Sequence, residues 1–195
     1  MHAAHLVAIL LWAVTATLLA LPVAQSPPGA GGFDLRVTPL PSPASENSGQ
    51  PQLTVSDHGL LLSWIERAGP QVTLKFAERT PTGWSLPRTV ASGDDWFVNW
   101  ADVPSVLRLD DGTLVAHWLQ VSGPGTYAYD VRLSYSTDDG TTWVASFTPH
   151  HDGTETEHGF ASLFQMPGAG LGVVWLDGRA MQSDTPSATT VGEVG

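Results

Sequence analysis

Three segments of this chain share one pattern, and the repeat that they form limits the folds open to it. Each segment (residues 51–64, 104–118 and 161–175) has an apolar stretch, a turn that contains glycine, and a second apolar stretch that ends in tryptophan. The three terminal tryptophans are 54 and 57 residues apart. A period of about 50 residues with several short strands per unit is typical of β-propeller blades, so the pattern predicts an all-β chain.

Strands within each unit are predicted from alternating apolar residues bounded by turn sequences. The first unit has a predicted third strand at 72–79 and a fourth that opens at Trp84, whereas the third unit supplies two strands. The second unit has four predicted strands, at 104–109, 113–120, 129–136 and from Trp143 onward. The predicted fold is a partial β-propeller of about two and a half four-stranded blades.

Composition divides the chain into four parts. Residues 1–24 are predicted to be a secretory signal peptide, because residues 6–21 are almost wholly apolar; an uncleaved membrane anchor is the alternative. Residues 25–50 are rich in proline, glycine and serine and predict a linker. The incomplete propeller blades then span 51–184, and 185–195 is predicted to be a truncated tail. The expected location is secreted or periplasmic, with membrane contact only through the N-terminal export segment.

Charge and cysteine content exclude several classes of protein. The chain has 8 basic and 19 acidic residues, a formal charge of −11, which argues against a nucleic-acid partner. It has no cysteine, which excludes disulfides, zinc–thiolate sites and iron–sulfur clusters.

Residues 136–143 read S-T-D-D-G-T-T-W and match the pattern S-x-D-x-G-x-T-W at every defined position. This segment resembles the Asp-box (BNR) repeat of sialidases, also called neuraminidases, which implies a six-bladed propeller when complete. We expect a structural role, in which Asp138 accepts backbone hydrogen bonds across the turn and Gly140 supplies a positive φ. The matching residues are Ser136, Asp138, Gly140, Thr142 and Trp143, the last packing between blades.

In an up-and-down blade the Asp-box turn lies on one face, and the loops between strands two and three share the opposite face with the links between blades. We expect a binding site on that opposite face, where aromatic, carboxylate and imidazole side chains suit a carbohydrate or glycoconjugate. The predicted substrate-binding residues are Trp96, Trp100, Asp102, Tyr127, Asp130, Glu157, His158 and Asp177.

The sialidase resemblance implies two catalytic residues. Asp177-Gly178-Arg179 follows an apolar strand, so Arg179 would bind a substrate carboxylate, and Asp184 five residues later would be the proton donor. The family's Arg-Ile-Pro motif is missing, because the matching places hold Asp102-Val103-Pro104 and Gly159-Phe160-Ala161. Neither Tyr127 nor Tyr129 is at a position that matches the family's tyrosine nucleophile.

Two functions remain open from the sequence. The first is a fragment of an exported sialidase-like glycoside hydrolase that acts on terminal acidic sugars, with exo-α-sialidase activity expected of the full-length gene and not of this chain alone. The alternative is a non-catalytic Asp-box propeller that binds extracellular glycan or protein, and a truncated product without independent function is a third reading. No cofactor is implied. Metal-ligand side chains also gather in one loop, but their spacing fits no known ligand pattern, so no metal ligand is predicted; they are His150, His151, His158, Asp152, Glu155 and Glu157.

Overall fold

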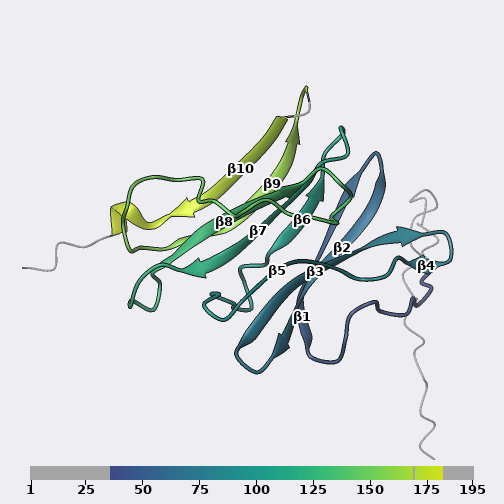
Figure 1. The fold of residues 1–195 in the computed structure, drawn as a ribbon, viewed down its shortest axis with the longest axis horizontal. Coiled ribbons are helices and arrows are strands. Elements are labelled where there is room, and N and C mark those ends of the chain that lie inside the picture. The colour runs from purple at the N-terminus through teal and green to yellow at the C-terminus, as the bar shows by residue number, and fades with distance from the viewer. Residues whose placement is uncertain (1–35, 169, 182–195) are drawn as a thin grey trace, which may run out of the picture. The chain divides into compact units, whose positions relative to one another are not determined.

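The computed structural model describes residues 36–168 and 170–181, which form three antiparallel sheets (Figure 1). The predicted all-β class is therefore confirmed. The first sheet contains β1 (Ser48–Ser56), β2 (Gly59–Ala68) and β3 (Gln71–Thr80), with β4 (Gly83–Trp84) and β5 (Arg88–Gly93) both paired to β3. The second contains β6 (Ser105–Arg108), β7 (Leu114–Val121) and β8 (Tyr129–Ser136). The third contains β9 (His158–Met166) and β10 (Gly170–Asp177).

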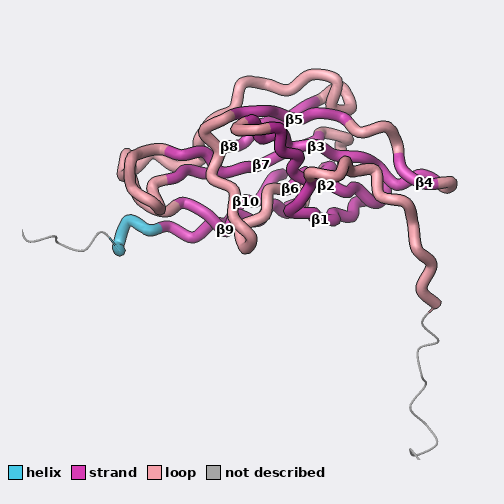
Figure 2. The backbone as a smooth tube through the Cα atoms, turned by 90° about the horizontal axis from the view of Figure 1, so that it is seen from below, coloured by secondary structure: helices cyan, strands magenta, loops and turns pink. Residues whose placement is uncertain are grey.

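The sheets follow one another in chain order, each packed beside the next. β1 contacts β6, and β6 in turn contacts β9, so the first strands of the three sheets are neighbours (Figure 1). A hydrogen bond of 2.7 Å from Thr54 Oγ1 to the Val106 carbonyl ties β1 to β6. Figure 2 shows a chain of strands and loops, with a short 3-10 turn at Gly178–Met181 after β10. Among the described residues, no helix has the length and apolar character that a membrane crossing requires.

Two boundaries in the first sheet differ from the sequence prediction. β1 begins at Ser48, which pairs with Glu66, so three residues assigned to the linker belong to the sheet. The predicted fourth strand from Trp84 is divided into the two-residue β4 and a separate β5 that starts at Arg88. Pro87 stands between them, and proline interrupts a strand ladder because it has no N–H to donate.

The predicted fourth strand of the second unit is an irregular segment along β8. It is held by reciprocal backbone hydrogen bonds between Phe147 and Leu133 and by one from Val144 N to the Tyr135 carbonyl, and it forms only an isolated bridge. The third sheet has two strands in the described ranges, as the sequence predicted.

Buried apolar side chains join each sheet to its neighbour. One core cluster combines Ile65, Leu74 and Phe76 of the first sheet with Val106 and Leu114 of the second. A second cluster combines side chains of β8 with partly buried residues of β9 and β10: Tyr129, Val131 and Leu133 pack against Leu163, Val173 and Trp175. Removal of this apolar surface from water stabilises the contacts between sheets.

Candidate functional site

Contacts between loops group them on two faces of the described structure. On one face, Asp110 N donates to Gln165 Oε1 at 3.1 Å, and His58 Nε2 lies 3.2 Å from the Asp110 carbonyl, which links the turns after β1 and β6 to the end of β9. On the opposite face, the loop before β8 meets the loop before β9, where Tyr129 Oη donates to Glu157 Oε1 at 2.6 Å. The candidate site lies on this second face.

The Asp-box turn lies on the first face and satisfies its own polar groups. Asp138 accepts hydrogen bonds from Thr142 N at 2.9 Å, Thr142 Oγ1 at 2.7 Å and Ser136 Oγ at 2.7 Å. These bonds lower the pKa of Asp138 to about 2. Gly140 has a φ of 78°, and Trp143 packs edge-on against Phe76 of the first sheet with ring centroids 6.1 Å apart. The turn thus contributes to the contact between sheets.

Five polar side chains come together on the opposite face, and we call them the His–Asp cluster. Asp130 lies near the start of β8, His150 and Asp152 lie in the loop before β9, His158 is the first residue of β9 and Asp177 is the last of β10. His158 and Asp177 are cross-strand partners in the β9–β10 ladder. Strand ends from two sheets therefore bring together residues that are 47 positions apart in the sequence.

Asp152 holds both imidazole rings of the cluster from one side. Its Oδ2 accepts a hydrogen bond from His158 Nε2 at 3.1 Å and lies 3.3 Å from His150 Nδ1. Its Oδ1 accepts hydrogen bonds from Thr154 Oγ1 at 2.6 Å and Thr154 N at 2.9 Å. The hydrogen bonds from Thr154 hold the pKa of Asp152 well below its usual range, so this side chain is a carboxylate.

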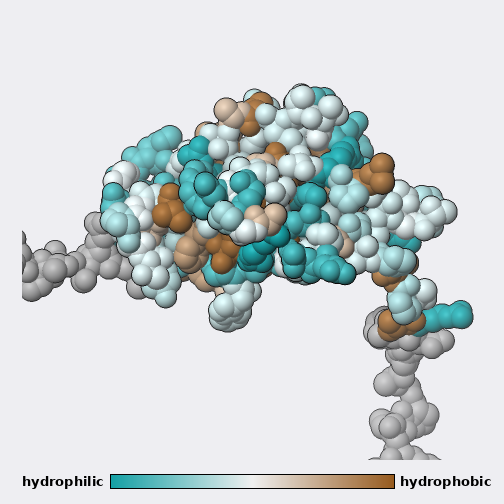
Figure 3. Space-filling view, turned by 60° about the horizontal axis from the view of Figure 1, so that its bottom comes forward, coloured by the Kyte–Doolittle hydropathy of each residue, from teal (hydrophilic) through white to brown (hydrophobic). Residues whose placement is uncertain are grey.

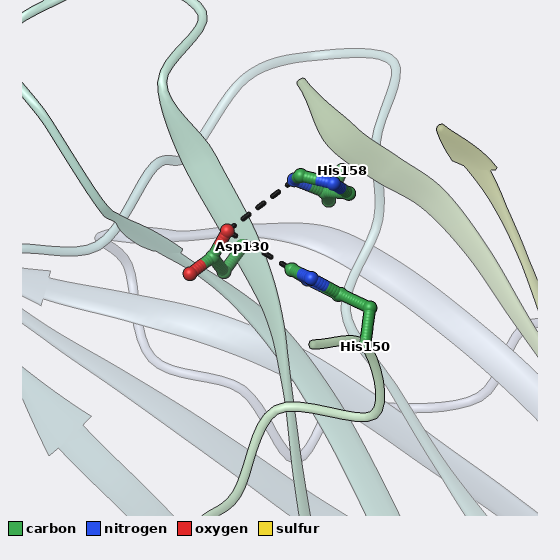
Figure 4. Close-up of side chains that lie close together, drawn as sticks. All are labelled: Asp130, His150 and His158. Atoms are coloured by element: carbon green, nitrogen blue, oxygen red, sulfur yellow. Dashed lines mark ion pairs between the residues drawn. The ribbon is translucent and has the colours of Figure 1, made fainter. Parts of the chain in front are cut away.

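The remaining ring nitrogens face Asp130 (Figure 4). Asp130 Oδ1 lies 3.3 Å from His158 Nδ1 and 3.6 Å from His150 Nε2. The two rings are stacked, with centroids 3.8 Å apart and planes 14° from parallel. Within the described residues, none of these three atoms has a hydrogen-bond partner. Burial, and after it the neighbouring His158, lowers the pKa of His150.

Arg179 lies at the rim of the cluster, where Asp177 holds it. Its Nε and Nη2 contact the two carboxylate oxygens of Asp177 at 2.9 and 2.8 Å, and 57% of its side chain is exposed. The backbone N–H of Arg179, and then its side chain, lowers the pKa of Asp177. Asp184, the predicted proton donor, lies outside the described residues.

A pocket of about 290 Å³ adjoins the cluster, and we call it the Tyr127 pocket. Tyr127 lines the pocket, and 64% of its surface is exposed. Two residues that line the pocket are sequence neighbours of the cluster: Glu157 precedes His158, and Gly178 follows Asp177. The lining residues are Gly125, Tyr127, Ala128, Glu155, Thr156, Glu157 and Gly178.

Asp102 lies in a second pocket, of about 330 Å³, between β1, β6 and β9. It is 2% exposed, and its Oδ2 accepts a hydrogen bond from Phe160 N at 2.6 Å. Burial raises the pKa of Asp102 despite that hydrogen bond, and the charge of Glu157 adds to the effect. His117, which sequence reasoning missed, lines the same pocket; its position within an apolar strand gave no signal of a polar role.

The two predicted loop tryptophans do not join either group. Trp96 stacks on Trp118 with ring centroids 5.1 Å apart and packs against the first core cluster. Trp100 is 90% exposed and does not line the Tyr127 pocket. Trp96 therefore has a packing partner of its own. Five of the residues predicted from the sequence do lie close together in the structure: Asp130, Glu157, His158, Asp177 and Arg179.

No protein-family model matches this chain, and no curated protein sequence matches it. Among solved structures, the endo-arabinase from Bacteroides thetaiotaomicron VPI-5482 is similar to it, with a TM-score of 0.47 and 16% sequence identity. The similarity covers 66% of this chain and 50% of that chain, so the matched region spans half the length of the endo-arabinase.

Proposed function

We propose that this chain is a glycan-binding module of the sialidase-like propeller type, exported from the cell, and that the Tyr127 pocket with Arg179 forms its carbohydrate face. The observation that carries the proposal is the convergence of loops from two sheets, which lines one pocket with an exposed aromatic ring and two glutamate side chains and places Arg179 directly after the pocket-lining Gly178. Aromatic rings stack on the apolar faces of sugars, and carboxylates accept hydrogen bonds from sugar hydroxyls.

Arg179 favours an acidic sugar as the ligand. The chain carries 8 basic residues against 19 acidic ones, and Arg179 places an exposed guanidinium directly after the pocket-lining Gly178. A guanidinium presents several N–H donors in a planar fork that matches a carboxylate. Terminal acidic sugars carry such a group, and their carboxylate would compete with Asp177 for Arg179.

Hydrolysis of the bound glycan is a second candidate function, supported by Asp102. Glycosidases need a carboxylic acid that keeps its proton until it donates to the leaving group. The raised pKa of buried Asp102 suits that role. Asp184 is the other candidate for the acid, on the ground of the sialidase resemblance. Tyr129 is hydrogen-bonded to a glutamate, but burial and Glu157 raise its pKa far above the usual value, which opposes the phenolate that a nucleophile requires.

Titration of the full chain with 3′-sialyllactose and with lactose tests the glycan-binding proposal. Tyr127→Ala should weaken binding of both sugars by roughly tenfold, because it removes the stacking surface. Arg179→Ala should weaken only the sialylated sugar, by about 10- to 100-fold, because it removes charge-assisted hydrogen bonds. Isothermal titration calorimetry measures both effects.

Tyr135→Ala is the matched control, because Tyr135 is an exposed tyrosine on β8 outside the Tyr127 pocket. An equal loss in Tyr135→Ala, or a folded chain that binds neither sugar, would contradict the proposal. An assay with a fluorogenic sialoside tests hydrolysis. If the chain turns the substrate over, loss of turnover in Asp184→Asn identifies Asp184 as the acid, and loss in Asp102→Asn alone identifies Asp102.

A further inference from the structure

The contacts with Asp152 determine which ring nitrogens of the His–Asp cluster carry lone pairs. Because Asp152 Oδ2 accepts from His158 Nε2, the neutral His158 ring has its proton on Nε2 and its lone pair on Nδ1. His150 Nδ1 lies 3.3 Å from the same Asp152 oxygen, so its proton is assigned to Nδ1 and its lone pair to Nε2. Both unprotonated nitrogens therefore lie near Asp130 Oδ1, which is itself an acceptor, at 3.3 Å for His158 and 3.6 Å for His150.

Three buried acceptor atoms close together destabilise the folded chain unless a proton or a metal ion lies between them. His158 is 0% exposed, its Nδ1 has no hydrogen-bond partner among the described residues, and the same holds for His150 Nε2 and Asp130 Oδ1. Buried acceptors that face one another repel and have lost their water. A single proton can join only two of the three atoms, whereas a metal ion can bind all three.

We infer that the His–Asp cluster binds one divalent transition-metal ion of the zinc class, with Asp130 Oδ1, His150 Nε2 and His158 Nδ1 as its ligands. The three atoms lie within 4.8 Å of one another. Ligand atoms about 2.1 Å from a tetrahedral ion are about 3.4 Å apart. The separations of 3.3 and 3.6 Å from Asp130 to the two rings agree with this spacing.

The donor set selects the metal. Two imidazoles with one carboxylate suit Zn²⁺ and its transition-metal neighbours, whereas Ca²⁺ and Mg²⁺ take oxygen ligands. Asp152 acts as the outer carboxylate that orients both rings and increases their basicity, an arrangement common at histidine metal sites. The cluster holds three carboxylate side chains with Arg179 as the nearby cation, and a dication balances that excess.

One local movement accompanies metal binding. The stacked rings are nearly parallel, so both lone pairs can reach one ion only if a ring tilts. His158 begins β9, whereas His150 lies in the irregular loop before it, so we expect the His150 ring to make this tilt. The metal site goes beyond the proposed glycan binding and reassigns Asp130 and His158 from sugar contacts to metal ligands.

Metal titration of the full chain after treatment with a chelator tests the inference. We expect one Zn²⁺ per chain, and one Co²⁺ with a visible absorption band of a low-coordinate site. Asp130→Asn and His150→Gln should each weaken Zn²⁺ binding by at least about 100-fold, while Asp152→Asn should weaken it by about 10- to 100-fold. Zn²⁺ should raise the melting temperature of the wild-type chain and not those of Asp130→Asn and His150→Gln.

His151→Ala is the matched control, because His151 is the exposed neighbour of His150 and belongs to neither group of side chains that could hold a metal ion among the described residues. It should bind Zn²⁺ as the wild type does. Circular dichroism establishes whether each variant is folded. Because His150 lies in a loop, we expect His150→Gln to fold and to test the inference even if Asp130→Asn does not fold. Equal Zn²⁺ affinity in wild type and folded His150→Gln, or binding of Ca²⁺ in preference to Zn²⁺, would overturn the inference. The result is independent of glycan binding, which depends on Tyr127 and Arg179.

Discussion

His117 and His158 are both fully buried, but their surroundings give them different chemistry. His158 is held by Asp152 and faces Asp130 across the cluster. His117 lies in β7, and within the described residues neither of its ring nitrogens has a partner. Burial therefore lowers the pKa of His117 to about 4 from its usual 6.5.

The pKa of His117 predicts a loss of stability in acid. The unfolded chain takes up a proton on this residue near pH 6.5, whereas the folded chain does so only near pH 4. The free energy of unfolding is unaffected above pH 6.5 and falls as the pH drops from 6.5 toward 4, by about 3 kcal/mol in total at about 1.4 kcal/mol per pH unit. Urea unfolding across this pH range measures the loss.

His117→Gln supplies the comparison, because glutamine has a similar size and does not titrate. Other histidines and carboxylates titrate equally in both proteins, so the difference between their unfolding free energies isolates His117. That difference should change between pH 6.5 and 4 and be constant above pH 7. A difference that is constant over the whole range would show that His117 is not buried in its neutral form.

At the scale of elements, the Asp-box turn shows how a local sequence also makes a contact between sheets. Gly140 has a positive φ, as the turn requires, and a Cβ added there would lie 2.5 Å from Cζ of Phe76 on β3. Asp139 on the same turn pairs with Arg108, which also pairs with Glu78 of the first sheet. The turn of the second sheet is therefore fitted closely against the first.

Gly140→Ala should consequently destabilise the chain by about 2–4 kcal/mol, from the strain of a positive φ together with the clash against Phe76. Gly112→Ala is the control, because Gly112 has a φ of 90° but no other atom within 4 Å of an added Cβ. It should cost only the backbone strain, about 1–2 kcal/mol. Urea midpoints compare the two variants, and equal losses would show that the Asp-box turn does not pack on Phe76.

The sequence predicted the regular elements better than the contacts between them. Repeat spacing and turn residues placed the strands of the first two sheets and divided the loops between two faces, because turn chemistry is local. The irregular segment after Trp143 was not predicted, since its pairing to β8 depends on tertiary packing. The His–Asp cluster was missed as a unit for the same reason: its partners come from two sheets, and only the fold sets the distance from Asp130 to His150.

Two opposing features of the whole molecule govern its behaviour in solution. The formal charge of −11 gives neighbouring chains a mutual repulsion. The third sheet, in contrast, exposes apolar side chains, including Val174 and Leu176 on one face of β10 and Phe164 on β9. Figure 3 shows hydrophobic residues as separate patches on a mostly pale or teal face. Within the described ranges β10 pairs only with β9, so one edge of this strand is unpaired.

This balance predicts self-association that increases with salt. Unpaired strand edges with exposed apolar residues pair readily with other chains, and salt screens the repulsion that opposes it. Sedimentation velocity at about 0.05 M and about 0.5 M salt should show larger species at the higher concentration, because the Debye length falls severalfold. Val174→Lys should abolish the increase by placing a charge beside the free edge, whereas Val121→Lys, at an exposed position on β7 in the second sheet, should not. A wild-type chain that sediments identically at both salt concentrations, or equal effects of the two lysine variants, would show that the β10 edge does not mediate association.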